Sequence, residues 1–337
     1  MKTSRRHLCF LTSLIFLLEI QLIHTPLMYV AADQNSPSDN LHDFRFTVAW
    51  ITDTQYYSKS HPEVLQQTIE WINNETRNGR ISFVAHTGDI VDSHDDVKQW
   101  KTFTTCWENL IAENYVIAGN HDNDYGDDWT AYDSHFPNMR YYYKSKDGYL
   151  FLFISYSLGR DEAVKRWLRN TIQNHNEKII VLTHQYLSSA GQLTDDGVDI
   201  EGILSEFKPR IFSVWCGHSA VNRIVQRTND NVFGILHDFQ SYKNGGNGYI
   251  VLVDMYESGF YMHLHSVVEG FDGKGKGQGY ELTVLLPTSG NVDSADNGMN
   301  SIILVAGSMV ALIIILALAV GPQHHRIRYL AIRNTGS

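Results

Sequence analysis

The chain is poor in cysteine and in basic charge. Its 337 residues include only three cysteines, which excludes a disulfide scaffold and a zinc-finger pattern. Its 27 Lys and Arg residues against 37 Asp and Glu give a net charge of −10. This balance argues against nucleic-acid binding, which needs clustered basic side chains. Internal repeats and long low-complexity runs are also lacking. The 43% hydrophobic content is ample for one sizeable globular core.

The N-terminal residues 1–32 have the pattern of a secretory signal peptide. A basic start precedes an apolar run over 8–18 that continues more weakly to residue 30. Small residues at 30–32 then offer a cleavage site. An uncleaved anchor helix is the alternative, because the apolar stretch is long. Residues 33–43 are polar, and we expect them to form a flexible leader.

The C-terminal part predicts a membrane anchor. Residues 301–320 carry no charge, and about 20 apolar residues in a helix span a bilayer. The basic tail over 321–337 predicts a cytoplasmic C-terminus, with the main domain outside. A lipid-anchor signal would end in the apolar run, so the polar tail argues against it. We therefore expect a single-pass type I membrane protein. Its domain over 44–285 would be extracellular or lumenal and joined to the membrane by a linker over 286–300.

Two further details fit such a location. Asn74-Glu75-Thr76 is a glycosylation sequon, which predicts a glycoprotein. Cys106 and Cys216 could pair in an oxidising compartment. Two buried thiols are the alternative, because the sequence does not set the distance between them.

The domain over 44–285 alternates between strand-like and helix-like apolar periodicities. Its first part predicts helices over 62–77 and 95–111 and strands over 44–51, 81–85, 115–118, 149–156, 178–183 and 211–216. From residue 223 onward, short strands separated by Gly and Asn turns follow. The pattern therefore predicts βαβ units first and antiparallel hairpins last.

Polar clusters follow several of these strands, where α/β proteins collect functional groups. The clusters are Asp53-Thr54-Gln55, Gly88-Asp89-Ile90-Val91-Asp92, Gly119-Asn120-His121-Asp122, Thr183-His184 and Gly217-His218. Each alone has a structural explanation, such as a helix cap or a satisfied core histidine. Together they would leave unpaired buried acids if no cation lay among them. Mixed carboxylate, amide and imidazole ligands suit zinc, iron and manganese.

The order of these motifs resembles that of the calcineurin-like metallophosphoesterases, over about residues 44–261. The segment 237–248 also resembles secreted and bacterial members whose first motif is Thr-Asp-Thr-Gln, as at residues 52–55 here. The resemblance implies an α/β fold: a calcineurin-like two-sheet sandwich flanked by helices, here with one C-terminal transmembrane helix. It also implies a site for two divalent or trivalent metal ions at the strand ends.

The resemblance assigns a role to each motif residue. The ligands would be Asp53 and Gln55 for the first metal, Asp89 as the bridge, and Asn120, His184 and His218 for the second metal. His121 would be the general acid, held in orientation by Asp92. Two cations flanking a hydroxide would provide a nucleophile at neutral pH and neutralise the phosphoryl oxygens. An imidazole can protonate the leaving oxygen because it titrates near neutrality.

Two departures from the family pattern fall on the first metal. Many members have His where Gln55 stands, and Ala220 occupies the place of a second His after His218. We therefore expect the second site to bind tightly and the first to be weak, labile or different in metal preference. His94 and His237 are candidates to fill the gap, with exposed loop positions as the alternative for each.

The segments around the site bear on the substrate. Protein Ser/Thr phosphatases continue the second motif with Asp-Arg-Gly, whereas this chain has Asp92-Ser93-His94, which argues against that subfamily. Seven aromatic residues near the motifs could line the substrate pocket or act as partly buried loop anchors. They are Tyr56, Tyr57, Trp129, Tyr132 and Tyr141 to Tyr143.

The sequence thus predicts a metal-dependent phosphoesterase that hydrolyses phosphomonoesters or phosphodiesters by attack of a metal-bound hydroxide. Its expected partners are a phosphate-ester substrate and, through the C-terminal helix, a membrane. The alternative is a membrane-tethered binding protein or receptor with impaired catalysis. Ala220 favours that alternative, whereas Asp92 and His121 favour an enzyme because they have no obvious role in binding alone.

Overall fold

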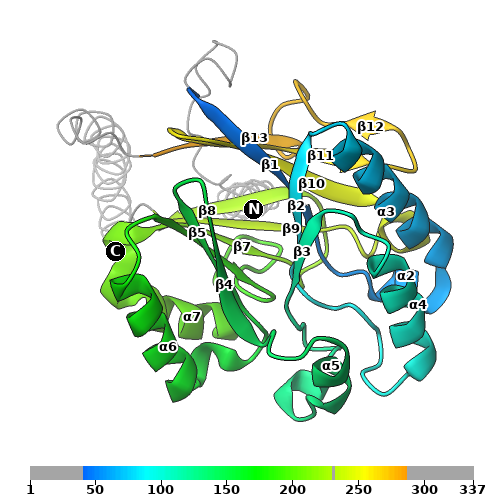
Figure 1. The fold of residues 1–337 in the computed structure, drawn as a ribbon, viewed down its shortest axis with the longest axis horizontal. Coiled ribbons are helices and arrows are strands. Elements are labelled where there is room, and N and C mark those ends of the chain that lie inside the picture. Colours follow the sequence, from blue (N-terminus) through cyan, green and yellow to red (C-terminus); the bar gives the residue numbers. More distant parts are fainter. Residues whose placement is uncertain (1–40, 230–231, 287–337) are drawn as a thin grey trace, which may run out of the picture. The chain divides into compact units, whose positions relative to one another are not determined.

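Residues 41–229 and 232–286 are described by the structure, which is a computed structural model. The predicted signal peptide, most of the leader, and nearly all of the segment after residue 285 lie outside this range, including the predicted membrane helix and tail. No helix within the described range is long and apolar enough to cross a membrane. The described chain folds into two β-sheets with helices on their outer sides (Figure 1).

The first sheet has seven strands. Its order is β12-β11-β10-β1-β2-β3, with β13 paired to β11. The strands are β1 (Phe44–Ile51), β2 (Ile81–His86), β3 (Glu113–Val116), β10 (Tyr249–Tyr256), β11 (Gly259–Ser266), β12 (Phe271–Asp272) and β13 (Glu281–Leu285). The parallel strands β1, β2 and β3 end at the same edge. Strand β10 joins β1 antiparallel and so adds the C-terminal hairpin to this sheet.

The second sheet has six strands in the order β4-β5-β6-β7-β9-β8. They are β4 (Tyr141–Lys146), β5 (Tyr149–Ile154), β6 (Lys178–Thr183), β7 (Ile211–Cys216), β8 (Val221–Asn229) and β9 (Val232–Asp238). Strands β5, β6, β7 and β9 are parallel, whereas β4 and β8 are antiparallel to their neighbours. The sheet is therefore mixed, with a parallel centre.

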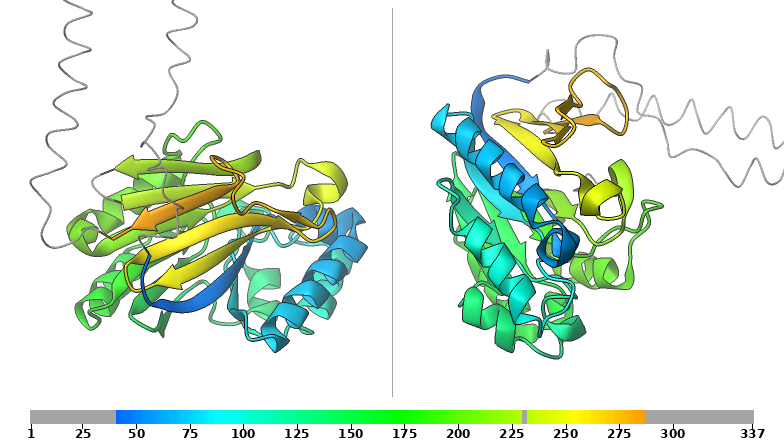
Figure 2. Two further views of the ribbon diagram at one scale, coloured as in Figure 1. Left: turned by 90° about the horizontal axis from the view of Figure 1, so that it is seen from above. Right: turned by 90° about the vertical axis from the view of Figure 1, so that its right-hand side faces the viewer.

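Helices cover the outer faces of the two sheets (Figures 1 and 2). The first sheet packs on helices α2 to α5, and α6 and α7 cover the second. The helices are α2 (Gln55–Ser60), α3 (Pro62–Arg77), α4 (Val97–Trp107), α5 (Thr130–His135), α6 (Glu162–Gln173), α7 (Asp195–Leu204) and α8 (Lys243–Gly246). The 3-10 turns are η1 (Asp124–Gly126), η2 (Leu158–Arg160) and η3 (Ser205–Arg210). Side chains of Asp96, Asp161 and Thr194 cap α4, α6 and α7 by accepting backbone N–H groups.

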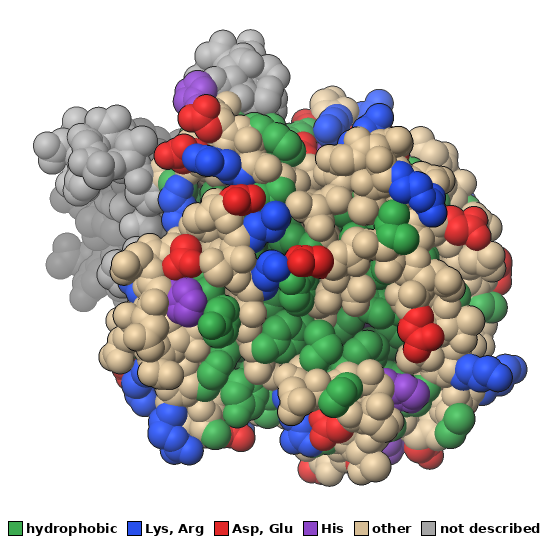
Figure 3. Space-filling view, viewed as in Figure 1, with side chains coloured by type: hydrophobic (Ala, Val, Ile, Leu, Met, Phe, Trp, Pro, Cys, Tyr) green, Lys and Arg blue, Asp and Glu red, His purple; other side chains and the backbone are tan. Residues whose placement is uncertain are grey.

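Aromatic side chains fill the space between the sheets. Trp50 of β1 stacks on Trp215 of β7 with ring centroids 5.2 Å apart, and Phe83 of β2 meets Phe151 of β5 at 5.2 Å. All four rings are buried. Large aromatic side chains contribute strongly to packing because each removes a wide apolar area from water. This layer holds the sheets face to face, and Figure 3 shows hydrophobic side chains gathered between the edge strands β3 and β4.

The structure changes two expectations about the domain. Strands β4 and β5 form an antiparallel hairpin, so the predicted βαβ pattern is interrupted there. Tyr141 to Tyr143 belong to β4, where Tyr142 stacks on Phe153 at 4.9 Å, rather than to the wall of a substrate pocket. Cys106 and Cys216 are both free thiols and do not pair; Cys216 is buried as the alternative expects, whereas Cys106 is half-buried.

Candidate metal centre

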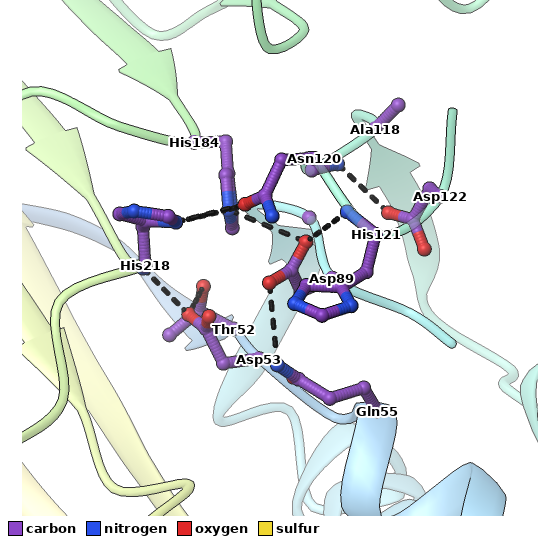
Figure 4. Close-up of polar contacts among 12 residues, drawn as sticks. Thr52, Asp53, Gln55, Asp89, Ala118, Asn120, His121, Asp122, His184 and His218 are labelled. Atoms are coloured by element: carbon purple, nitrogen blue, oxygen red, sulfur yellow. Dashed lines mark hydrogen bonds and ion pairs between the residues drawn. The ribbon is translucent and has the colours of Figure 1, made fainter. Parts of the chain in front are cut away.

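The predicted ligands meet at one edge of the sandwich, where strands of both sheets end (Figure 4). Asp53, Asp89 and Asn120 follow β1, β2 and β3 of the first sheet. His184 and His218 follow β6 and β7 of the second sheet. Parallel neighbours end at the same edge, which is why motifs far apart in the sequence come together. The centre is therefore shared between the two sheets.

Four ligand atoms converge on the side predicted for the second metal. The Nε2 atom of His184 lies 3.0 Å from Asn120 Oδ1, 3.1 Å from His218 Nδ1 and 3.3 Å from Asp89 Oδ1. The Nδ1–H of His184 donates to the carbonyl oxygen of Thr87 at 2.8 Å. Such a second bond orients a histidine so that its other ring nitrogen can bind a metal. Asp89, His184 and His218 form a compact potential metal-binding group.

The electrostatics of this group fit a cation. Burial opposes a charged His184, but the carboxylates of Asp89 and Asp53 outweigh it and raise the pKa of His184 to about 10. Burial likewise opposes ionised Asp89, but facing His184 lowers the pKa of that carboxyl. Burial and the charge of His184 lower the pKa of His218 to about 4, which keeps its ring neutral. The carboxylate of Asp89 and its neighbours thus favour a positive charge among them. A metal ion would supply that charge in place of the proton on His184.

The side predicted for the first metal contains oxygen donors. Asp53 accepts hydrogen bonds from Thr52 Oγ1 at 2.5 Å and from the backbone N–H of His218 at 2.9 Å. Gln55 donates from Nε2 to Asp89 Oδ2 at 3.2 Å, while its own Oε1 is buried without a hydrogen-bond partner. A buried oxygen without a hydrogen-bond partner, on an amide that contacts the Asp89 carboxylate, is an atom to which a cation can bind. Burial and the charge of Asp238 raise the pKa of Asp53.

Sequence reasoning missed two residues on this side, Asp238 and Gln240. Asp238 is the last residue of β9 and is fully buried, and Gln240 follows it. Gln240 Nε2 donates to Asp238 Oδ2 at 2.8 Å and to Asp53 Oδ1 at 3.4 Å. The signal was present, because polar residues also lie at the end of this strand. It was overlooked because β9 was expected to be purely antiparallel, whereas it runs parallel to β7 and ends at the same edge.

The predicted general acid lies beside the ligands. The backbone N–H of His121 donates to Asp89 Oδ1 at 3.0 Å, and its side chain is half-buried. The ring Nδ1 of His121 donates to the main-chain carbonyl oxygen of Asp92 at 2.8 Å, so the contact with Asp92 is through the backbone. The carboxylate of Asp92 instead pairs with Lys59 Nζ at 2.5 Å. The ring of Tyr125, which is 62% exposed, lies 6.0 Å from that of His121 and was not predicted near the site.

A buried carboxylate joins two of the motif loops. Asp122 accepts backbone N–H groups from Ile90 at 2.8 Å, Val91 at 3.0 Å and Gly119 at 2.7 Å. Burial and the nearby Asp89 raise the pKa of Asp122 to about 7. Close approach also explains the glycine, because a Cβ at Gly119 would lie 2.1 Å from Asp89 Oδ1. Asp122, the last residue of the Gly-Asn-His-Asp motif, thus joins the loops after β2 and β3 through hydrogen bonds.

Two predicted alternatives do not reach the first site. His237 is buried against Trp50, with ring centroids 4.3 Å apart, and neither of its ring nitrogens has a hydrogen-bond partner. His94 faces Asp128 at 3.9 Å. Within the described residues, neither imidazole contacts Asp53 or Gln55. Ala220 is exposed, and its methyl side chain has no atom that can bind a metal.

The aromatic residues predicted as a possible pocket wall lie in different environments. Tyr57 and Tyr132 are buried core residues, and Tyr57 accepts the backbone N–H of Gly248 at 3.0 Å. Trp129 is half-buried under the guanidinium of Arg140. Tyr56 is 36% exposed and, unlike the core tyrosines, is available to a ligand.

Comparison with known proteins agrees with this arrangement. The model of the calcineurin-like phosphoesterase family matches residues 46–222. The uncharacterized protein YvnB of Bacillus subtilis (strain 168) is 26% identical over 268 residues, which cover 70% of this chain and 20% of YvnB. The chain therefore spans about a fifth of the length of that relative.

Two solved structures share the fold. Purple acid phosphatase PPD1 from yellow lupin (Lupinus luteus) seeds is 13% identical with a TM-score of 0.54, covering 75% of this chain and 58% of its own. A dimetal phosphatase from Danio rerio is 13% identical with a TM-score of 0.52, covering 73% of this chain and 100% of its own. Because the family model matches more than half of the chain, the protein belongs to the calcineurin-like phosphoesterase family.

Proposed function

We propose that the protein hydrolyses phosphomonoesters or phosphodiesters at a two-metal centre on the extracellular or lumenal side of a membrane. The observation that carries the catalytic part is that Asn120 Oδ1 and Asp89 Oδ1 both lie within 3.3 Å of His184 Nε2, beside His121. Bound metal ions supply Lewis acidity, a water of lowered pKa and positive charge for the phosphoryl oxygens.

The chain's own residues account for orientation and proton transfer. Asp89, His184 and Asn120 would hold the ions, and the Thr87 carbonyl fixes the ring orientation of His184. His121 donates from Nδ1 to a carbonyl oxygen, so its Nε2 is the atom that can deliver a proton to the leaving oxygen. The substrate ester would bind next to this ring.

A hydrolysis assay tests the catalytic part. The full-length chain is stripped with a chelator and reloaded with zinc, manganese or iron. It is then assayed with 4-nitrophenyl phosphate and bis(4-nitrophenyl) phosphate beside Asp89→Asn. We expect metal-dependent turnover of at least one ester, and loss of that turnover in Asp89→Asn. Turnover no higher than that of Asp89→Asn with every metal would reject the hydrolase.

A catalytically impaired binding protein is the second candidate, because exposed Ala220 provides no imidazole to the first metal. The same assay separates the two functions. A binding protein would take up metal and retain a phosphate ester without releasing its product.

The membrane location rests on the sequence patterns of residues 1–32, 301–320 and 321–337. The sequon residue Asn74 is exposed on α3, which makes it accessible to glycosylation. Protease added to sealed vesicles of known orientation provides the test. From the cytoplasmic face it should remove only the tail over 321–337, and digestion of the large domain from that face would invert the proposed orientation.

A further inference from the structure

The first metal side of the centre has a different chemistry from the second. The second side combines the imidazoles of His184 and His218 with oxygen donors. On the first side, no imidazole ring contacts Asp53 or Gln55 within the described residues. We propose that Gln240, oriented by Asp238, is a ligand of the first metal, and that this site is built from oxygen donors alone. The inference deepens the proposed function and rests on its metal-binding part.

The strand pairing explains why Gln240 stands where a ligand is missing. Strand β8 starts at Val221, directly after Ala220, and Val221 is the antiparallel partner of Asp238 in β9. The segment Asp238–Gln240 is therefore the cross-strand neighbour of Ala220. A side chain from this adjacent segment can reach the space that an imidazole at position 220 would otherwise occupy.

The contacts of Gln240 place its amide among the other donors. Its Nε2 donates to Asp53 Oδ1 at 3.4 Å, and its Oε1 accepts from Gln55 Nε2 at 2.5 Å. Gln55 in turn contacts Asp89 Oδ2 at 3.2 Å. One connected group thus joins Asp53, Gln240, Gln55 and the bridging Asp89. Within it, the Gln240 amide lies between the carboxylates of Asp53 and Asp238, as a cation would.

Asp238 sets the direction of the Gln240 amide. Its Oδ1 accepts the backbone N–H of Gln240 at 2.8 Å, and its Oδ2 accepts Nε2 at 2.8 Å. The amide nitrogen is therefore held by the carboxylate, and the amide oxygen points to the opposite side, toward Gln55. Asp238 acts through Gln240 and is a positioning residue.

Burial and charge show that, among the described residues, these carboxylates have no lysine or arginine as a counter-ion, and that His184 pairs only with Asp89. Asp53, Asp89 and Asp238 are each at most 1% exposed, and in the described part of the chain no lysine or arginine forms an ion pair with any of them. The Oε1 atom of Gln55 is buried and has no hydrogen-bond partner. Unpaired buried carboxylates are costly unless a cation is bound. The unpaired Gln55 Oε1 is a further oxygen atom to which such a cation could bind.

The donor types predict different metal preferences for the two sites. Carboxylate and amide oxygens suit manganese and magnesium, whereas imidazole nitrogens suit zinc and iron. We expect the first site to accept Mn²⁺ while Zn²⁺ occupies the site of His184 and His218. The missing imidazoles then represent a change of ligand chemistry rather than a loss of the site.

Metal counting tests the assignment without reference to activity. Full-length protein is stripped of metal, given one equivalent of Zn²⁺ and then excess Mn²⁺, and freed of unbound ions. Elemental analysis should find one zinc and one manganese per wild-type chain. Gln240→Ala should keep the zinc and weaken Mn²⁺ binding about tenfold or more, as removal of ligand-shell groups does. Gln240→Glu should keep both ions, because a carboxylate can replace the amide oxygen.

Two further variants separate ligation from folding. Gln66 is exposed on α3 and contacts Glu70, so Gln66→Ala is the matched control and should bind both ions as the wild type does. Asp238→Asn should weaken Mn²⁺ binding about tenfold by letting the Gln240 amide turn. It should leave zinc content and the melting temperature of the metal-free chain unchanged, whereas a purely structural role would lower both.

The outcomes distinguish this inference from the proposed function. Manganese binding by Gln240→Ala within twofold of the wild type would overturn it, even if the enzyme is active. Loss of zinc together with manganese in that variant, or binding of only one ion by the wild type, would also overturn it. The predicted metal counts without any turnover would reject the hydrolase and leave the ligand assignment standing.

Discussion

His121 Nδ1 lies 2.8 Å from the main-chain carbonyl oxygen of Asp92. A carbonyl oxygen only accepts hydrogen bonds, so Nδ1 must carry the hydrogen. The remaining ring nitrogen, Nε2, is therefore the one that exchanges a proton. The main chain sets this orientation, so we expect it to persist when the Asp92 side chain is changed.

The first prediction concerns His121 as the proton donor. His121→Asn should lower kcat/KM about 10²- to 10⁴-fold for alkyl phosphates, whose leaving groups need protonation. It should affect 4-nitrophenyl esters much less, because nitrophenolate leaves without a proton. Steady-state kinetics with both ester types provides the measurement. An equal loss for the two leaving groups would assign His121 to substrate binding instead.

The second prediction separates the carbonyl of Asp92 from its carboxylate. Asp92→Asn preserves the carbonyl contact to His121 and removes only the ion pair with Lys59, whose side chain is 49% exposed. Pairs this exposed contribute about 0–1 kcal/mol. We expect kcat of Asp92→Asn to fall less than about tenfold, far less than in His121→Asn. Lys59→Met is the matched control, and a loss as large as that of His121→Asn would show that the carboxylate acts directly.

The third prediction concerns the hydrogen bonds by which Asp122 joins the two motif loops. Asp122→Ala leaves three buried backbone N–H groups without an acceptor, and each unsatisfied group costs about 1–3 kcal/mol. We expect the free energy of unfolding in urea to fall by about 3 kcal/mol or more. Asp95→Ala, an exposed substitution in the loop after β2, is the control and should change it little. Equal stability of the two variants would mean that the motif loops hold together without Asp122.

The fourth prediction is a pH dependence that comes from His237. Burial lowers its pKa to about 3, whereas an unfolded histidine titrates near 6.5. Between these values the unfolded chain binds the additional proton, so the stability due to neutral His237 is present above pH 6.5 and is lost as pH falls toward 3. His237→Phe cannot take up that proton. Its advantage over the wild type in free energy of unfolding should grow by about 1.4 kcal/mol between pH 7.5 and 5.5.

Urea unfolding of the metal-free chain at both pH values provides the measurement for His237. Metal is left out because ligand protonation would add its own pH dependence. Parallel stability curves for the wild type and His237→Phe would show that His237 is protonated in the folded chain or hydrated there.

Much of the site was predictable because its residues follow strands with clear apolar runs. Asp53, Asp89 and His184 each come directly after such a run, and parallel strands end at a common edge. Gly119 and Asn120 could be placed on the same grounds. The order of the motifs along the chain was enough to bring these residues together.

Other parts depend on contacts that the sequence does not encode locally. Asp92 and Lys59 are 33 positions apart, and no local pattern shows that their charges pair. The contribution of Asp238 and Gln240 depends on β9 running beside β7, which is a property of the sheet. The hairpin of β4 and β5 was overlooked because the half-exposed tyrosines from Tyr141 onward were taken for loop anchors rather than an edge strand.

The sharing of the centre between two sheets has a consequence for the folding kinetics. Asp53 and Gln240, which belong to different sheets, are 187 positions apart, and His218 meets Asp53 across 165 positions. Contacts this distant form only after a large loop-closure entropy has been overcome. Neither sheet alone carries a complete set of ligands, so the ions can bind tightly only after the sheets have docked. Metal ions should therefore slow the unfolding of the finished protein and leave its folding rate nearly unchanged.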